Sequence, residues 1–179
     1  MKNNLGYACI NMTLSEQPKS KRITTNRSMI KRTFKARGLP YASELALQNV
    51  LDLEKIIQWN EDNDVKFYRM SSDVFPWASE YQLEDLPDFK AIAASLQRSG
   101  DLARKYGQRI TTHPGPFNKL TSPREQVVLN TITDLENHGR LFDLMGLPRT
   151  PYAKINIHVG AHYNDKAMAI GNFCRNFER

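Results

Sequence analysis

Two histidines close two apolar, strand-like runs of the sequence and could together bind a metal ion. His113 ends the run Gln-Arg-Ile-Thr-Thr-His, and His158 ends the run Lys-Ile-Asn-Ile-His. Imidazole is a common metal ligand, and side chains at the carboxyl ends of parallel strands meet at one mouth of an α/β barrel. The pair is therefore predicted to be two ligands of one ion, although a strand-end histidine taken alone is more often a structural residue.

Strand-like and helix-like segments alternate along the chain and must position these histidines. Apolar runs predict strands over 5–10, 65–70, 108–112 and 154–158, and helical periodicity predicts helices over 44–60, 89–106, 123–145 and 165–177. Ser43, Asp88 and Ser122 are the expected helix caps, and Pro123 suits a first helical position. Alternation of this kind predicts parallel strands with right-handed crossovers.

The fold class is therefore α/β, with two architectures open. One is a small doubly wound sheet, and the other is the first half of a TIM (β/α)8 barrel, with about four βα units in a single partial domain over 1–179. The sequence has no Gly-x-Gly-x-x-Gly after its first strand and no Gly-Lys-Ser/Thr phosphate loop, which argues against a nucleotide-binding doubly wound sheet.

Composition predicts a reduced, soluble protein with a preference for anionic partners. The chain of 179 residues carries a net charge of +6. Its two cysteines, Cys9 and Cys174, match no metal or redox spacing. No run approaches the roughly 20 apolar residues of a membrane helix. We expect no membrane partner and a cytoplasmic, nucleoid-associated location in a bacterial or phage-like setting.

A basic segment follows the first predicted strand and is expected to be a long βα loop over 15–43. Its cations include Lys31, Arg32, Lys35 and Arg37, and no acidic residue lies between Glu16 and Glu44. A solvated loop without a ligand is one interpretation. The other is a DNA-binding loop, because this segment should emerge on the same rim as the histidines and could contact phosphates.

Acidic side chains that could complement the histidines follow the second strand. Asp73, in Ser-Ser-Asp, fits a turn or cap as well as a site. Glu80 lies in Trp-Ala-Ser-Glu-Tyr and could face the site as a metal-binding or proton-transferring group. The flanking Trp77 and Tyr81 are either packing or DNA-facing residues. Oxygen ligands of this kind suit hard divalent ions.

Four motifs in this order resemble the UV damage endonuclease family. They are Gly6-Tyr7-Ala8-Cys9-Ile10-Asn11-Met12-Thr13-Leu14, then Phe67-Tyr68-Arg69-Met70-Ser71-Ser72-Asp73 with Phe75-Pro76, then His113-Pro114-Gly115, and finally Ile157-His158-Val159-Gly160 with Asp165-Lys166. The resemblance extends from about Leu5 to the last residue. It implies a TIM-barrel DNA repair nuclease related to endonuclease IV.

The resemblance also implies a mechanism and a set of site residues. Such enzymes use divalent ions, with Mn²⁺ expected here and Mg²⁺, Co²⁺ or Zn²⁺ as alternatives, to hydrolyse UV-damaged double-stranded DNA 5′ of cyclobutane dimers and (6-4) photoproducts. By motif match, His113 and His158 are metal ligands, and Tyr7 and Asn11 are active-site residues. Lesion selectivity would come from extrusion of the poorly stacked damaged bases.

Two positions depart from the family pattern. Pro116-Phe117 stands where the family commonly has Gln-Tyr, so Phe117 keeps a stacking face for a wedge against DNA but the polar groups are lost. Glu80 stands where the family commonly has a histidine.

The family's remaining acidic and histidine ligands have no counterpart in this sequence, so we expect the chain alone not to cleave DNA. A half barrel would expose strand edges, so we expect self-association or a second polypeptide that completes the barrel. The alternatives are a xylose-isomerase-like, metal-dependent sugar isomerase and a non-catalytic DNA-binding remnant.

Overall fold

The computed structural model describes residues 5–161 and 163–179. Three parallel strands form one sheet in the order β1-β2-β3, with β1 at Gly6–Ala8, β2 at Phe67–Met70 and β3 at Arg109–Thr112. Tyr7 pairs with Tyr68, which pairs with Ile110. The predicted α/β class with parallel strands is therefore confirmed.

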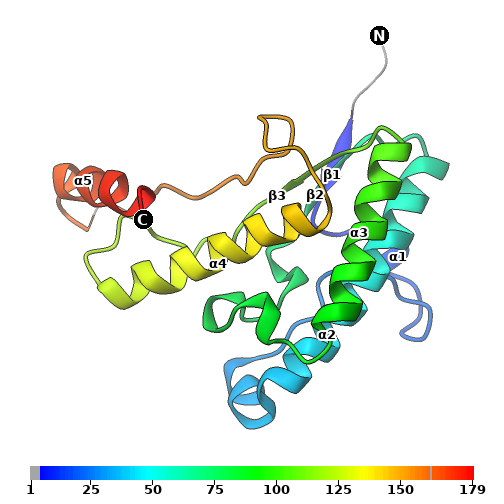
Figure 1. The fold of residues 1–179 in the computed structure, drawn as a ribbon, viewed down its shortest axis with the longest axis horizontal. Helices are drawn as coiled ribbons and strands as arrows, with labels where there is room; N and C mark the ends of the chain where they lie inside the picture. The colour runs from blue at the N-terminus through cyan, green and yellow to red at the C-terminus, as the bar shows by residue number, and fades with distance from the viewer. Residues whose placement is uncertain (1–4, 162) are drawn as a thin grey trace.

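Helices connect the strands and cover one face of the sheet (Figure 1). The connections after β1 and β2 contain α1 (Met12–Ser15), α2 (Lys31–Asp62), the short 3-10 helices η1 (Ser72–Val74), η2 (Ala78–Glu80) and η3 (Leu83–Asp85), and α3 (Phe89–Lys105). After β3 come α4 (Glu125–Leu144) and α5 (Lys166–Phe177). Figure 1 shows α2 and α3 side by side, with α5 at the opposite end of the molecule. Helices α2 and α3 pack closely on one another, and both contribute side chains to the hydrophobic core.

The two faces of the sheet differ in what their side chains contact. Tyr68, Met70 and Ile110 are fully buried among the apolar side chains of the helices. Because side chains alternate along a strand, Arg69 and Thr111 project from the opposite face. Arg69 and Thr111 are directly paired neighbours on β2 and β3. This second, polar face is the one that leads to His113, two residues beyond Thr111.

Helix α2 begins earlier than the sequence indicated and shortens the predicted loop over 15–43. The helical stretch starts at Lys31 and is interrupted only at Gly38, whose φ of 62° is left-handed. Pro40 follows this break within the helix. A polar first segment interrupted by Gly and Pro has no apolar periodicity, which explains why it looked like a loop. Ser43, expected to cap the helix, lies inside it and donates a hydrogen bond to Asp88 at 2.8 Å.

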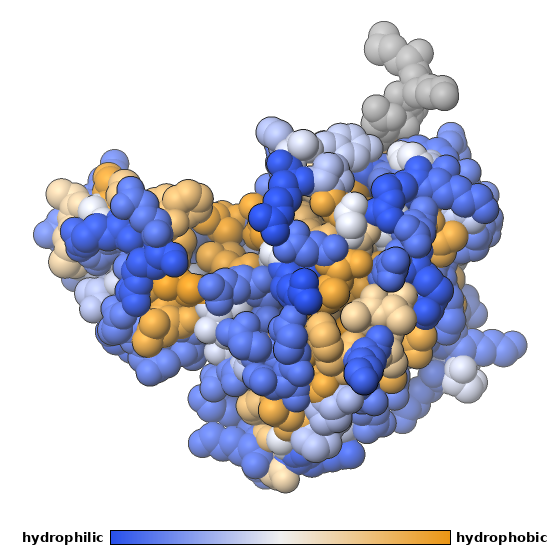
Figure 2. Space-filling model, in the orientation of Figure 1, coloured by the Kyte–Doolittle hydropathy of each residue, from blue (hydrophilic) through white to orange (hydrophobic). Residues whose placement is uncertain are grey.

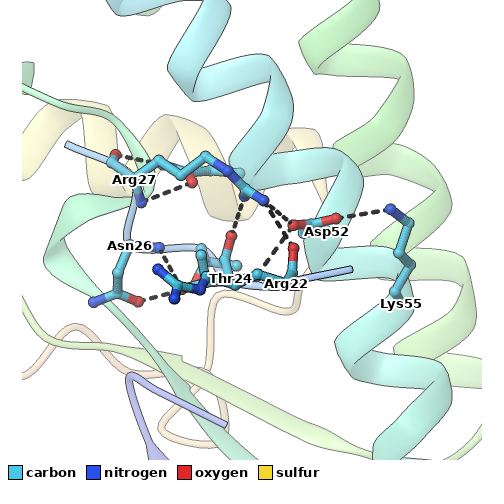
Figure 3. Close-up of polar contacts among 8 residues, drawn as sticks. Arg22, Thr24, Asn26, Arg27, Asp52 and Lys55 are labelled. Carbon is cyan, nitrogen blue, oxygen red and sulfur yellow. Dashed lines mark hydrogen bonds and ion pairs between the residues drawn. The ribbon is translucent and has the colours of Figure 1, made fainter. Parts of the chain in front are cut away.

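The non-helical part of the basic segment is fixed to α2 by one buried carboxylate (Figure 3). Asp52 forms ion pairs with Arg27 at 2.7 Å and with Lys55 at 2.8 Å. It also accepts a hydrogen bond from the backbone N–H of Thr24 at 3.1 Å. Asn49 adds two bonds to the backbone of Arg27, both at 3.0 Å. One cation of the predicted DNA-binding segment thus has a structural partner.

The fourth predicted strand, over 154–158, is reduced to one bridge between Thr112 and Ile155. Thr112 N–H donates to the carbonyl of Lys154, and Asn156 N–H donates to the carbonyl of Thr112, both at 3.0 Å. The segment pairs with β3 alone, and this pairing does not extend to His158. The expected cap of α4 also differs, because the Ser122 hydroxyl accepts from Arg124 N–H at 3.1 Å and the helix begins at Glu125.

Among residues 5–161 and 163–179, no helix combines the length and apolar character needed to cross a bilayer. Hydrophobic side chains nevertheless reach the surface over α5 and across the middle of the face in Figure 2. Met168, Ile170 and Phe177 of α5 are 38%, 55% and 66% exposed. Asn172 and Asn176 attach this helix to the loop before α4 by donating to the carbonyls of Thr121 and Leu120.

Candidate active site

His113 and His158 lie together, as the sequence predicted. Their ring centroids are 4.4 Å apart, with 52° between the ring planes. His113 Nδ1 is 2.6 Å from the backbone carbonyl of Asn156. A carbonyl can only accept, so Nδ1 carries a proton, and in the neutral form of the ring Nε2 then keeps its lone pair. Backbone-fixed imidazoles with a free second nitrogen are typical of metal ligands.

The charge around this pair is positive. The pKa of His158 is lowered, first by desolvation and then by the positive charges of His113, Lys119 and Arg69. A lowered pKa favours the neutral imidazole, which is the form that coordinates a metal. The local field therefore favours an anion next to the pair, or a metal ion that arrives with anionic ligands.

The two imidazoles fit part of a metal site. Within the described part of the chain, no group of three or more His, Cys, Asp or Glu side chains could hold an ion. Catalytic zinc sites, for comparison, normally use three protein ligands. His113 and His158 can supply two imidazole positions.

Glu80, the acidic candidate, is an exposed residue of η2. Its carboxylate forms no hydrogen bond or ion pair with residues 5–161 or 163–179, so no contact within them fixes its direction. Its neighbour Trp77 packs instead. The ring stacks on Phe34 at 5.6 Å and 14°, and its Nε1 donates to the carbonyl of Met29 at 3.0 Å. Trp77 holds a left-handed φ of 63°, which is unusual for a bulky residue.

Tyr7 and Asn11 lie together, but on the helix-facing side of the sheet. Asn11 Nδ2 donates to the Tyr7 hydroxyl at 3.0 Å, and that hydroxyl donates to Asn60 Oδ1 at 2.7 Å. Asn11 also caps α1 by accepting from Leu14 N–H at 3.0 Å. Burial raises the pKa of Tyr7 despite these hydrogen bonds. The network gives both residues a structural role, and their catalytic role stays a prediction.

The proposed DNA-contacting cations occupy the first segment of α2. Lys31 Nζ lies 5.9 Å from the Trp77 ring centroid, and Arg37 stacks over Tyr41 at 3.4 Å. Arg32 and Lys35 are exposed on the same helical segment. These residues form a solvent-facing cationic helix rather than an irregular loop.

An open cleft of about 650 Å³ is lined by Ser28 and Met29, which precede α2, and by the loop after His113. Phe117, at its rim, is 89% exposed. Asp73 and Asp134 line the cleft. The pKa of Asp73 is raised, mainly by burial and further by the charge of Asp134. An exposed aromatic side chain beside a cleft is compatible with a wedge residue, and the wedge role of Phe117 stays a prediction.

His138 of α4 is buried behind β3. Its Nδ1 is 3.1 Å from the Thr112 hydroxyl, and its Nε2 is 3.8 Å from Asp134. Burial lowers its pKa, the charge of Asp134 acts in the opposite direction, and His113 adds to the lowering. Sequence reasoning did not find Asp134 or Asn60, because neither belongs to a motif and only the packing of α4 and α2 brings them to the sheet.

A model of the family described as UV-endonuclease UvdE matches residues 3–179. The chain belongs to this family. It is 35% identical to the UV-damage endonuclease of Schizosaccharomyces pombe over 180 residues, which covers 99% of this chain and 29% of that protein. It is 33% identical to a putative UV-damage endonuclease of Acanthamoeba polyphaga mimivirus, with coverage of 98% and 52%.

A solved structure described as the crystal structure of SacUVDE superposes on this UvdE-family chain with a TM-score of 0.79 and 28% identity. The match covers 97% of this chain and 55% of the solved one. The chain thus spans about half the length, or less, of these three relatives. The family model covers both His113 and His158, so the pair lies within the region that this chain shares with the family.

Proposed function

We propose that these residues form the amino-terminal part of a DNA repair endonuclease that cuts 5′ of UV photolesions. The observation that carries this proposal is the imidazole pair of His113 and His158, in a chain that belongs to the UvdE family. The His113 proton on Nδ1 leaves Nε2 for a metal, and the positive surroundings suit a phosphodiester.

The proposed architecture is about four βα units of a TIM barrel. Parallel order β1-β2-β3, followed by the bridge at Ile155, supports it. The superposition on just over half of the solved UvdE-family chain also supports it. In such a barrel the polar sheet face with Arg69 and Thr111 would turn inward, and the helices would stay outside.

The proposed cofactor is a divalent ion, manganese first, held in part by His113 and His158. A bound ion of this kind would supply Lewis-acid activation of the phosphodiester. Asn156 would orient His113 through its carbonyl. Remaining ligands would come from a second polypeptide or from further chain beyond these residues, so the 179 residues alone are proposed to be inactive.

The proposed substrate is double-stranded DNA that carries a UV lesion. Lys31, Arg32, Lys35 and Arg37 would contact the phosphate backbone, and Phe117 would insert against the bases opposite the extruded lesion. Tyr7, Asn11 and Glu80 would act near the lesion, as the family motif implies. The non-catalytic DNA-binding remnant is the second candidate, favoured by the two-histidine donor set.

The test is a nicking assay on a duplex with one cyclobutane dimer, with Mn²⁺ and with the chain alone or mixed with the carboxyl-terminal half of a UvdE-family relative. We expect incision only with both pieces, and loss of incision in His113→Ala. His138→Gln is the control for a histidine outside the pair. Dimer-dependent binding by the chain without incision in any mixture would favour the remnant, and no preference for DNA would overturn both functions.

A further inference from the structure

The polar face of the sheet carries one cation that the described protein leaves without a partner. We propose that Arg69 binds a phosphodiester of the DNA backbone beside the imidazole pair. This inference rests on the proposed function and adds a phosphate-binding residue to it.

The first observation is that the Arg69 guanidinium is unsatisfied. Its Nε is buried, and it has no hydrogen-bond partner. Among residues 5–161 and 163–179, no hydrogen bond or ion pair of this side chain is found. A guanidinium carries five N–H donors and stays charged, and leaving such a group half-buried and unpaired is costly. An oxyanion that accepts from Nε and a terminal nitrogen would remove that cost.

The second observation is the position of Arg69. It pairs with Thr111 across β2 and β3, and both side chains project from the face that leads to His113. The guanidinium therefore lies on the sheet face that ends at the imidazole pair of His113 and His158.

The third observation comes from a second arginine on the same sheet face. Arg109 is two residues before Thr111, so it projects in the same direction. Its Nε donates to the carbonyl of Tyr152 at 2.8 Å, and the guanidinium lies 5.4 Å from the ring centroids of Phe67 and Tyr152. Arg109 thus has its partners inside the protein, whereas the Arg69 guanidinium is free to bind an anion from outside it.

The geometry and charge of the guanidinium favour a phosphate group as its ligand. The planar guanidinium fork matches two oxygens of one phosphate or carboxylate. In the described part of the chain, no carboxylate joins the two imidazoles to make a group of three metal-ligating side chains. A phosphodiester supplies the missing negative charge and is the group on which the proposed enzyme acts. A carboxylate from another polypeptide is the rival, and the experiment separates the two.

The first measurement is an NMR titration of the arginine Nε–Hε signals of the 179-residue chain. The probes are inorganic phosphate, acetate and chloride at matched ionic strength. We expect phosphate alone to shift the Arg69 signal saturably, with the Arg109 signal unmoved. Equal shifts with acetate, or no shift with phosphate, would overturn the inference. Arg69→Lys should keep weakened phosphate binding, because it retains the charge but loses the fork.

The second measurement is the salt dependence of affinity for an undamaged duplex, with Arg69→Gln and Arg109→Gln as a matched pair. One lost phosphate contact lowers the slope of log K against log salt by about 0.9. We expect that change for Arg69→Gln and an unchanged slope for Arg109→Gln. Equal slopes for all three proteins would refute Arg69 as a phosphate residue. If the unaltered chain does not bind DNA, the proposed function fails, and the phosphate titration alone decides on Arg69.

Discussion

Removal of the Asp52 carboxylate should destabilise the protein more than removal of any single exposed ion pair. Asp52 is 4% exposed, and it joins the segment before α2 to the helix itself. Asp52→Ala would leave the Arg27 guanidinium without its ion-pair partner and the Thr24 N–H without its acceptor. Breaking a buried pair from one side costs about 3–5 kcal/mol. Because the Arg27 side chain is 25% exposed, we expect a loss of about 3 kcal/mol in the free energy of unfolding.

The two cations of Asp52 provide an internal control (Figure 3). Lys55 is 58% exposed at a similar 2.8 Å from the carboxylate, so Lys55→Ala should cost below about 1 kcal/mol. Arg27→Ala should cost about 2 kcal/mol, since it removes the less exposed cation. Urea unfolding of the single and double variants measures each coupling free energy. A Lys55–Asp52 coupling as large as the Arg27–Asp52 coupling would refute the argument from burial.

Three further predictions concern close packing, a buried histidine and the metal site. Gly100→Ala should lower the free energy of unfolding by about 1–3 kcal/mol, because its new Cβ would lie 1.7 Å from the Met145 carbonyl oxygen. Gly139→Ala is the control: its Cβ would meet open space, so the same urea assay should show α4 stabilised by about 0.5–1 kcal/mol. Burial lowers the pKa of His138 in the folded state, so the unfolded chain binds the proton more readily below a pH of about 6.5. The free energy of unfolding should therefore fall as the pH falls, by at most about 1.4 kcal/mol per pH unit. Unfolding measured from pH 7.5 to 5 should show a shallower slope in His138→Gln, and equal slopes would contradict this. His113→Ala should lower Mn²⁺ affinity in isothermal titration by at least about tenfold, and an unchanged affinity would exclude His113 as a ligand.

Elements with strong apolar periodicity were predictable from the sequence. Helix α3 occupies 89–105 where 89–106 was expected, and β3 occupies 109–112 where 108–112 was expected. The first segment of α2 was not predictable, because it is polar and precedes Gly38 and Pro40. The three 3-10 helices over 72–85 also have no periodic signal. Their short turns depend on contacts such as Asn137 with the carbonyls of Ala78 and Tyr81.

The candidate site was only partly predictable for a similar reason. His113 and His158 could be found because each follows an apolar run and each sits in a family motif. Arg69 also sits in one of these motifs, but nothing in the residue itself says whether it pairs within the protein. Only the register, which places it opposite Thr111 on the polar face, and its missing partner identify it. The unsatisfied group, rather than the motif, is the informative observation.

Backbone pairing next to β3 brings the two histidines together. They are far apart in the sequence, and the bridge between Thr112 and Ile155 places their two segments side by side. That bridge places the Asn156 carbonyl 2.6 Å from His113 Nδ1, so one residue both pairs with β3 and orients the ring. A pair held in this way is sensitive to whatever adds to, or competes for, the edge next to Ile155. A strand added at this edge would favour extended backbone toward His158, so completion of the sheet would also order one ligand of the proposed metal site.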